Sequence, residues 1–225
     1  TQTNVNIMKS IAPEIAKVAP NALYVIVSNP VDIMTYVFTK ISGIPENQII
    51  GSGTLLDTAR LRNTLSEHFQ VAQGNIHAYV FGEHGDSSFV PWSCASVSGV
   101  ELDEYLALMK SFGKEVEDLD KDGMVDFVHK SGGIVIANKG ATFYAIASSV
   151  CKLCSILSAS TDSVITVSSM MHGEYGIEDV CISTLTLAGP NGIRGKVPVK
   201  LNDEEVAKLQ ASANALKEVI AQIEL

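Results

Sequence analysis

The sequence predicts an α/β protein in which a short α/β segment precedes a mixed α+β segment, with the boundary near Ser52. Two observations carry this prediction. Residues 21–27 (NALYVIV) are almost continuously apolar, as in a strand that is buried on both faces of a parallel sheet. Further along the chain, three apolar runs are joined by glycine-rich turns, which is typical of an antiparallel meander.

The first segment is predicted to run helix, strand, polar corner, helix. Apolar residues recur at mostly helical spacing over residues 4–18. Ser28-Asn29-Pro30 ends the strand that follows, because proline cannot donate to a ladder and favours the start of a helix. That helix covers residues 31–41, and Gly51-Ser52-Gly53 then resembles a hinge.

The second segment mixes helices with short strands. Helices are predicted over residues 55–69, 102–110, 124–137, 142–157 and 202–223, and strands over residues 76–81, 90–97, 164–170, 180–188 and 192–197. The last helix opens with a capping-box pattern, because Glu205 stands three residues after Asn202.

Composition argues against several classes of protein. The 225 residues are 46% hydrophobic, which is enough for a sizeable core. A net charge of -9 argues against a nucleic-acid-binding surface, and no apolar run reaches the ~18 residues of a membrane span. Four cysteines make no disulfide framework in a chain this long, so we expect a cytoplasmic protein. We also expect a fragment, because Thr1 opens the chain without Met inside a predicted helix.

The segment Gly82-Glu83-His84-Gly85-Asp86-Ser87 is the strongest candidate for chemistry. An imidazole between glycines at a strand end can move one proton near neutral pH. Asp57 and Arg60 are three residues apart on a predicted helix and so share a face. In a cleft, Asp57 would stabilise an imidazolium and Arg60 would grip a carboxylate. The alternatives are a hydrogen-bonded turn histidine and an ordinary surface ion pair.

Other polar residues are more ambiguous. Asn29 offers an amide at the strand-end corner, or is only a turn residue, and Thr142 has the character of a helix N-cap. Cys151 and Cys154 lie in an apolar helix without a second pair, so we expect buried small hydrophobic residues rather than a metal site. Among the remaining histidines, His77 is compatible with a satisfied core group, whereas His68, His129 and His172 look peripheral.

Five segments resemble the L-lactate/malate dehydrogenase family in their order and spacing. They are residues 27–32 (VSNPVD), 57–60 (DTAR), 82–87 (GEHGDS), 139–142 (KGAT) and 173–176 (GEYG). The resemblance covers essentially the whole chain, and Glu83 and Thr142 favour the lactate branch of bacterial type.

The resemblance implies two domains. Residues 1–53 would be the C-terminal part of a Rossmann-type doubly wound sheet that binds a dinucleotide. Residues 54–225 would be the α+β catalytic domain of this family, with helix 144–162 packing back on the first domain.

The resemblance also implies roles for the candidate residues in interconverting pyruvate and L-lactate with the cofactor NAD. His84 would be the proton donor and acceptor, Asp57 its partner, and Arg60 the anchor of the substrate carboxylate. The substrate-binding set would be Arg60, Asn29 and Thr142, and the cofactor-binding set would be Val27, Asn29 and Ile146.

Two further residues suggest regulation. In bacterial lactate dehydrogenases that resemble this chain, residues of the types and offsets of Arg62 and His77 bind fructose 1,6-bisphosphate between subunits. A cationic pair suits a phosphate, although the two could equally be a plain anion or packing pair. By the same analogy we expect a homotetramer.

Some family features are absent. The glycine-rich phosphate loop, the ribose-binding acid and the mobile substrate loop with its second arginine are not in this sequence. Leu185 stands where a proline is usual, and Gly133 and Ile134 replace an aromatic–acidic pair. The alternatives therefore stay open: malate or another 2-hydroxy acid dehydrogenase, a non-catalytic fragment, which we would expect to be inactive and aggregation-prone, or a sugar-phosphate-binding protein.

Overall fold

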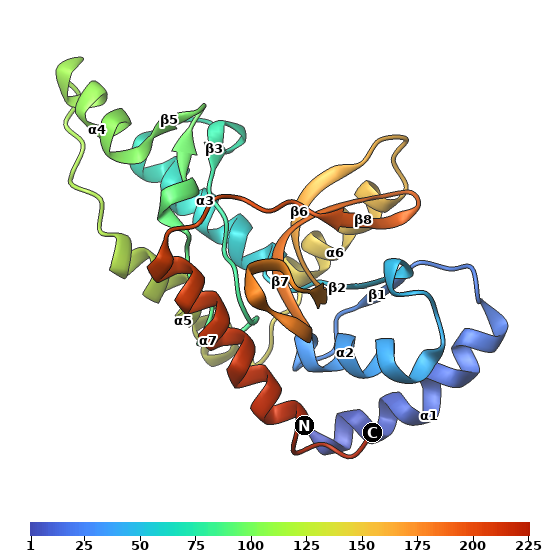
Figure 1. Cartoon of the computed structure of the whole chain (residues 1–225). Coiled ribbons are helices and arrows are strands. Elements are labelled where there is room, and N and C mark those ends of the chain that lie inside the picture. Colours follow the sequence, from blue (N-terminus) through green and yellow to red (C-terminus); the bar gives the residue numbers. More distant parts are fainter.

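A computed structural model describes residues 1–225, and its elements follow one another as a partial α/β unit and then a mixed unit (Figure 1). The helices are α1 (Gln2–Val18), α2 (Val31–Ser42), α3 (Leu55–Phe69), α4 (Leu102–Ser111), α5 (Lys121–Lys139), α6 (Tyr144–Leu157) and α7 (Asp203–Ile220). The strands are β1 (Tyr24–Ile26), β2 (Ile49–Gly51), β3 (Ile76–His77), β4 (Ser96–Val97), β5 (Val100–Glu101), β6 (Ser163–His172), β7 (Glu178–Gly189) and β8 (Gly192–Lys196).

One five-stranded sheet joins the two segments of the chain, in the order β1-β2-β6-β7-β8. Strands β1 and β2 pair in parallel, whereas β6, β7 and β8 form an antiparallel meander. The two halves meet antiparallel where Gly51 of β2 faces Ser168 of β6. A second sheet of three short antiparallel strands, β3-β4-β5, lies apart from the first.

The Gly51-Ser52-Gly53 segment is buried and packed rather than an open hinge. A Cβ atom on Gly51 would lie 2.3 Å from Thr35 Oγ1 and 2.9 Å from the Ser168 Cβ. Gly53 has a φ of +47°, and its Cβ would lie 2.2 Å from Ser183 Oγ. The glycines therefore let α2 and the meander approach the same stretch of backbone.

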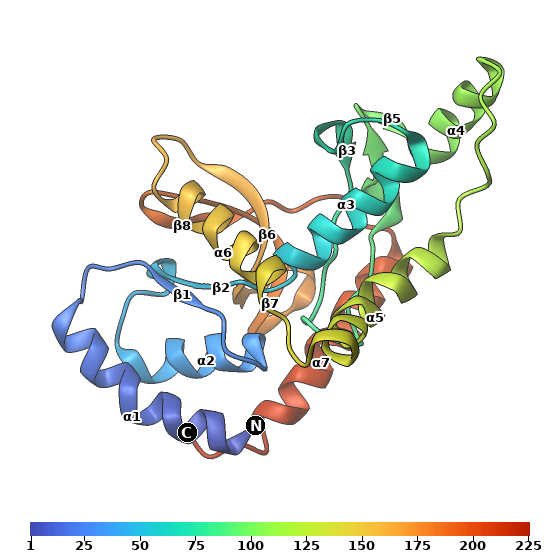
Figure 2. The same ribbon diagram turned by 180° about the vertical axis from the view of Figure 1, so that it is seen from behind.

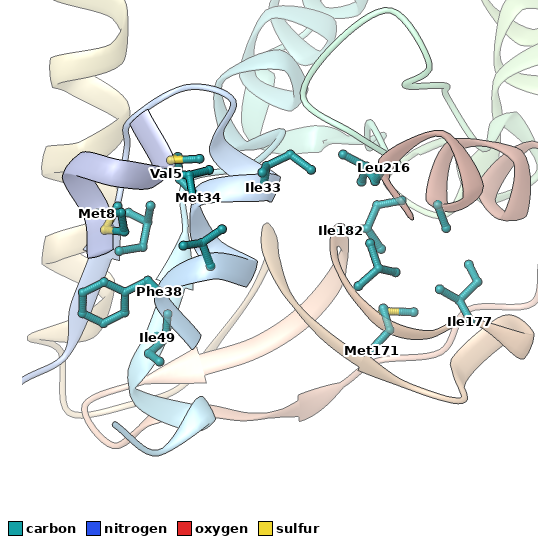
Figure 3. Close-up of a cluster of buried hydrophobic side chains, with 14 of the residues drawn as sticks. Val5, Met8, Ile33, Met34, Phe38, Ile49, Met171, Ile177, Ile182 and Leu216 are labelled. Atoms are coloured by element: carbon teal, nitrogen blue, oxygen red, sulfur yellow. The ribbon is translucent and has the colours of Figure 1, made fainter. Parts of the chain in front are cut away.

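Helix α2 lies at the centre of the largest apolar cluster, between α1, the large sheet and α7 (Figures 2 and 3). All eight residues from Val31 to Phe38 are buried. Met34 and Phe38 pack with Met8 of α1 and Ile49 of β2 within this cluster. Burying each such apolar side chain stabilises the fold by about 1.5–3 kcal/mol. The charged side chain of Asp32 in the same stretch is costly to bury unless other groups compensate for its lost water.

Two smaller clusters hold the remaining helices. Leu61, Leu65 and Phe69 of α3 pack against the three-stranded sheet, α4 and α5. In the second of these clusters, α6 packs on β2 and β6, and Leu153 lies in the same cluster as Ile50 and residues of the meander. Helix α6 therefore returns to the part of the sheet that the first segment builds.

Helix α7 is fixed at its start by the capping box that the sequence predicts. The Asn202 side chain accepts from the backbone N–H of Glu205 at 2.9 Å, and the Glu205 side chain accepts from the backbone N–H of Asn202 at 3.1 Å. The tail after α7 returns to α1, where the Gln2 side chain makes two hydrogen bonds with the Glu224 backbone (Figure 1).

Several short elements differ from the sequence prediction. The strand expected over 76–81 is limited to Ile76–His77. The strand expected over 90–97 is limited to Ser96–Val97 and follows a 3-10 turn at Trp92–Cys94. Strands β2 and β5 were not predicted, because two or three residues carry no periodicity. Helix α6 begins at Tyr144 with Phe143 as its N-cap, so the N-cap prediction for Thr142 is wrong. None of the helices has the length and apolarity to cross a membrane.

Replacing Gly51 by alanine should destabilise the protein, because the new methyl group overlaps Thr35 and Ser168. We expect a loss of about 1–3 kcal/mol in the free energy of unfolding, measured by urea denaturation. Gly74→Ala is the matched control, since nothing lies within 4 Å of its Cβ position. Equal effects of the two substitutions would contradict the close packing at Gly51.

Candidate active site

A cavity of about 230 Å³ opens between the two segments of the chain. It is lined by residues from the corner after β1, from α3, from the loop after β3, from α5 and from the start of α6. The structure brings into this one cavity the predicted catalytic, substrate and cofactor residues: Val27, Asn29, Asp57, Arg60, His84, Thr142 and Ile146.

The Asp57 carboxylate is shared between two cationic side chains. His84 Nδ1 lies 2.6 Å from Asp57 Oδ2, and Arg60 Nη1 donates to Asp57 Oδ1 at 3.1 Å. The Asp57 side chain is only 9% exposed, whereas that of His84 is 30% exposed. Asp57, Arg60 and His84 all line the cavity, and the acid is the most buried of the three.

This environment favours the protonated form of His84. The hydrogen bond to Asp57 raises the pKa of His84 above its usual 6.5, and the charges of Asp57 and Asp32 raise it further. Burial and the Arg60 charge lower this pKa, but the upward effects prevail. With Nδ1 held by Asp57, the neutral ring leaves Nε2 as the nitrogen available to a molecule in the cavity.

Three elements of the fold hold the loop that carries His84. The Gly82 backbone pairs with β7 through two hydrogen bonds of 3.0 and 3.1 Å. Glu83 N–H donates to Ser212 Oγ of α7 at 2.9 Å, and His84 N–H donates to Asp32 Oδ2 of α2 at 2.7 Å. Gly82 is needed here because its φ is +100° and its Cβ would lie 2.9 Å from Ser212 Oγ.

Sequence reasoning missed three residues at this site. His129 of α5 was expected to be peripheral, but it lines the cavity, and its Nε2 lies 2.8 Å from Ser88 Oγ and 3.1 Å from the Ser88 carbonyl. Asp32 was quoted only as part of a motif, although it holds the His84 backbone. Asp32 could have been recognised because it is the only acid in a strongly apolar helix. Nothing in the sequence around His129 or Ser88 indicates that they line the cavity.

Arg62 and His77 lie outside this cavity. Arg62 is half-buried, donates from Nε to the carbonyl of Ala78 at 2.9 Å, and its guanidinium lies 4.9 Å from the Tyr79 ring centroid. His77 is exposed on β3 and immediately precedes Ala78. The expectation that His77 is a core group is therefore wrong, and His77 lies next in sequence to the residue whose carbonyl binds Arg62.

The remaining polar clusters do not resemble a metal centre. Cys151 and Cys154 are both exposed on α6, so the expectation that they are buried is wrong. No group of three or more His, Cys, Asp or Glu side chains is placed to hold a metal ion.

Two family patterns match the chain and together cover almost all of it. The lactate/malate dehydrogenase NAD binding domain matches residues 1–51, and the lactate/malate dehydrogenase alpha/beta C-terminal domain matches residues 54–224. The chain therefore contains part of the first domain together with the second.

Individual proteins agree with these patterns. The chain is 44% identical to L-lactate dehydrogenase 1 of Clostridium acetobutylicum over 220 residues, which is 98% of the chain and 69% of that protein. It is 41% identical to an L-lactate dehydrogenase of Acetivibrio thermocellus, over 99% of the chain and 69% of that protein. A solved L-lactate dehydrogenase from Clostridium thermocellum superposes with a TM-score of 0.90 at 37% identity, covering 99% of this chain and 72% of that one.

The His84–Asp57 pair should make stability depend on pH. Because the pKa of His84 is raised above 6.5 in the folded state, its stabilising contribution is complete below about pH 6.5 and is lost as pH rises through the folded-state pKa. We expect Asp57→Asn to flatten this decline. Urea denaturation at pH 6 to 8 tests this, with His84→Gln as the control that removes the titration. Parallel curves for wild type and both variants would contradict the coupling.

Proposed function

The chain belongs to the lactate/malate dehydrogenase family, and on that premise we propose that it is the larger part of an NAD-dependent L-lactate dehydrogenase. The observation that carries the proposal is one cavity in which His84 and Arg60 share the Asp57 carboxylate. Relatives named L-lactate dehydrogenase, at about 40% identity, support the choice of substrate. The two domains would divide at residues 53 and 54.

His84 would move the proton. Its Nε2 donates to the C2 oxygen when pyruvate is reduced and accepts the hydroxyl proton when L-lactate is oxidised. Asp57 keeps Nδ1 protonated and stabilises the imidazolium that exists before the donation. The raised pKa of His84 supports this role, since a proton donor must be charged at the working pH.

Arg60 would hold the substrate carboxylate. Its side chain is 17% exposed and uses Nη1 to bind Asp57, which leaves other guanidinium N–H groups for the ligand. A planar guanidinium can bind a carboxylate through two parallel hydrogen bonds, which a lysine cannot do. Thr142 and Asn29 line the same cavity and would complete the substrate site.

The residues present fit the nicotinamide end of the cofactor. Val27 is 36% exposed directly after the carboxyl end of β1, where parallel sheets bind dinucleotides. Ile146 of α6 and Asn29 line the cavity beside Val27. The Asn29 carbonyl accepts from Asn4 Nδ2 at 2.7 Å, which holds this corner in place. NAD, when bound, supplies and accepts the hydride.

The family analogy extends the proposal to the whole protein. We place it in the cytoplasm as a homotetramer that acts in pyruvate fermentation, with fructose 1,6-bisphosphate bound between subunits at Arg62 and His77. Two observations support the activator site. His77 is exposed, and it directly precedes Ala78, whose carbonyl accepts a hydrogen bond from Arg62.

The assignment of substrate is tested in a protein that also carries the portion present in the relatives and absent from these 225 residues. We expect faster NADH oxidation with pyruvate than with oxaloacetate. Arg60→Lys should lower kcat/KM for pyruvate by about tenfold or more, since hydrogen bonds between charged groups contribute about 1.5–3 kcal/mol. Arg194→Lys is the control, because Arg194 is half-exposed and lies away from the cavity. A preference for oxaloacetate would instead assign malate dehydrogenase activity.

The proposed activator site predicts that fructose 1,6-bisphosphate improves the apparent affinity for pyruvate. Arg62→Gln should abolish this response, because the variant loses the charge that binds phosphate. Steady-state assays with and without the sugar bisphosphate measure the effect, with Arg194→Gln as the control. An unchanged affinity in the wild-type protein would rule out the activator site.

A further inference from the structure

Asp32 is a buried acid that the proposed chemistry does not use. It lies in the first turn of α2 and is 2% exposed, between the buried residues Val31 and Ile33. Burying a carboxylate costs several kcal/mol unless other groups compensate for the lost water. Its Oδ1 atom is buried without a hydrogen-bond partner, so the compensation is incomplete.

The hydrogen bond that Asp32 does make is to the histidine of the candidate site. Asp32 Oδ2 accepts from the backbone N–H of His84 at 2.7 Å. Asp57 binds the ring of the same residue at 2.6 Å. Two acids from two helices, α2 and α3, therefore hold His84, one by its backbone and the other by its side chain.

The groups around Asp32 shift its titration towards neutral pH. Burial raises the pKa of Asp32 to about 6, and the Glu83 charge also raises it. The Ser168 hydroxyl, the His84 N–H and the His84 charge act in the opposite direction.

Other elements also bring titratable groups near this pair. From the sheet, Cys181 of β7 and Lys196 of β8 interact electrostatically with Asp32. Burial lowers the pKa of Lys196 to about 8, and its amino group is held by Ser169 at 2.6 Å. From α3, Asp57 binds the ring of His84, and Arg60 binds Asp57 and lowers the pKa of His84 through its charge.

We propose that Asp32 is a positioning residue, whose buried carboxylate fixes the backbone of His84 and stabilises the protonated ring when Asp32 is ionised. The consequence for turnover rests on the proposed function, whereas the effect on His84 does not. Because Asp32 and His84 are close and interact, they titrate as a pair. Protonation of Asp32 removes negative charge from beside the imidazolium, so His84 loses its proton more readily once Asp32 has been neutralised.

Two substitutions at position 32 separate the effect of the Asp32 charge on His84 from the effect of its hydrogen bond to the His84 backbone. Asp32→Asn keeps an oxygen that can accept from the His84 N–H but removes the charge, so we expect the pKa of His84 to fall while its amide stays protected. Asp32→Ala removes both, so the pKa should fall and amide hydrogen exchange at His84 should speed up by about tenfold or more. Asp179→Asn is the control, because Asp179 also contacts α2, through Tyr36 and Lys40, but does not contact the candidate site.

The measurement is a pH titration of the histidine rings by NMR on ¹⁵N-labelled protein, with His84 assigned from the spectrum of a His84→Gln variant. In the wild type, the His84 backbone amide shift should follow the titration of Asp32 near pH 6. The proposal would be overturned if the wild-type amide shows no such inflection, or if His84 keeps its wild-type pKa in Asp32→Asn. The wild-type amide titration needs no variant, so it still tests the proposal if neither variant folds. No step requires turnover. If these shifts are observed but the longer protein that carries the missing portion does not reduce pyruvate, only the proposed function is refuted.

Discussion

The shared carboxylate of Asp57 is the interaction on which the rest of the site depends, and the fold fixes it through the start of α3. Thr54 Oγ1 donates to the Val80 carbonyl at 2.5 Å, and Thr58 Oγ1 accepts from the Val80 N–H at 2.9 Å while also pairing with Thr166 of β6. These buried hydroxyls lie one turn apart on either side of Asp57. The helix therefore cannot rotate without breaking bonds to both the histidine segment and the sheet.

The cavity lies between the two segments of the chain, and each segment supplies part of its lining. The first segment contributes the end of β1 and the buried α2, and the second contributes α3, the histidine loop and α6. A single residue pair, Gly51 with Ser168, joins β2 to the meander. Close packing at this junction holds the segment that carries Asn29 against the segment that carries His84, and both residues line the cavity.

Local patterns predicted much of this arrangement, because its longer helices and its motifs are encoded by nearby residues. The helix over 55–69 and the capping box at Asn202 were expected from local patterns, whereas the grouping of His84, Asp57 and Arg60 was expected from the family resemblance. Features set by distant packing were not. The role of Asp32 depends on a loop 52 residues away, and His129 reaches the cavity only because α5 lies across Ser88. Strand β2 is three residues long, and only its partners reveal it.

Helix α7 connects the segment around Ser93 with the loop that carries His84. At its first turn Glu205 closes the capping box and also accepts hydrogen bonds from the backbone and hydroxyl of Ser93. Ser212 stands seven residues later, two helical turns or about 10 Å along the same face, and its hydroxyl supports Glu83. Because the helix is rigid, the position of Glu205 at its start determines the position of the Ser212 hydroxyl two turns later. A change at Glu205 would therefore move the Ser212 hydroxyl and, through it, the histidine loop that Glu205 does not contact.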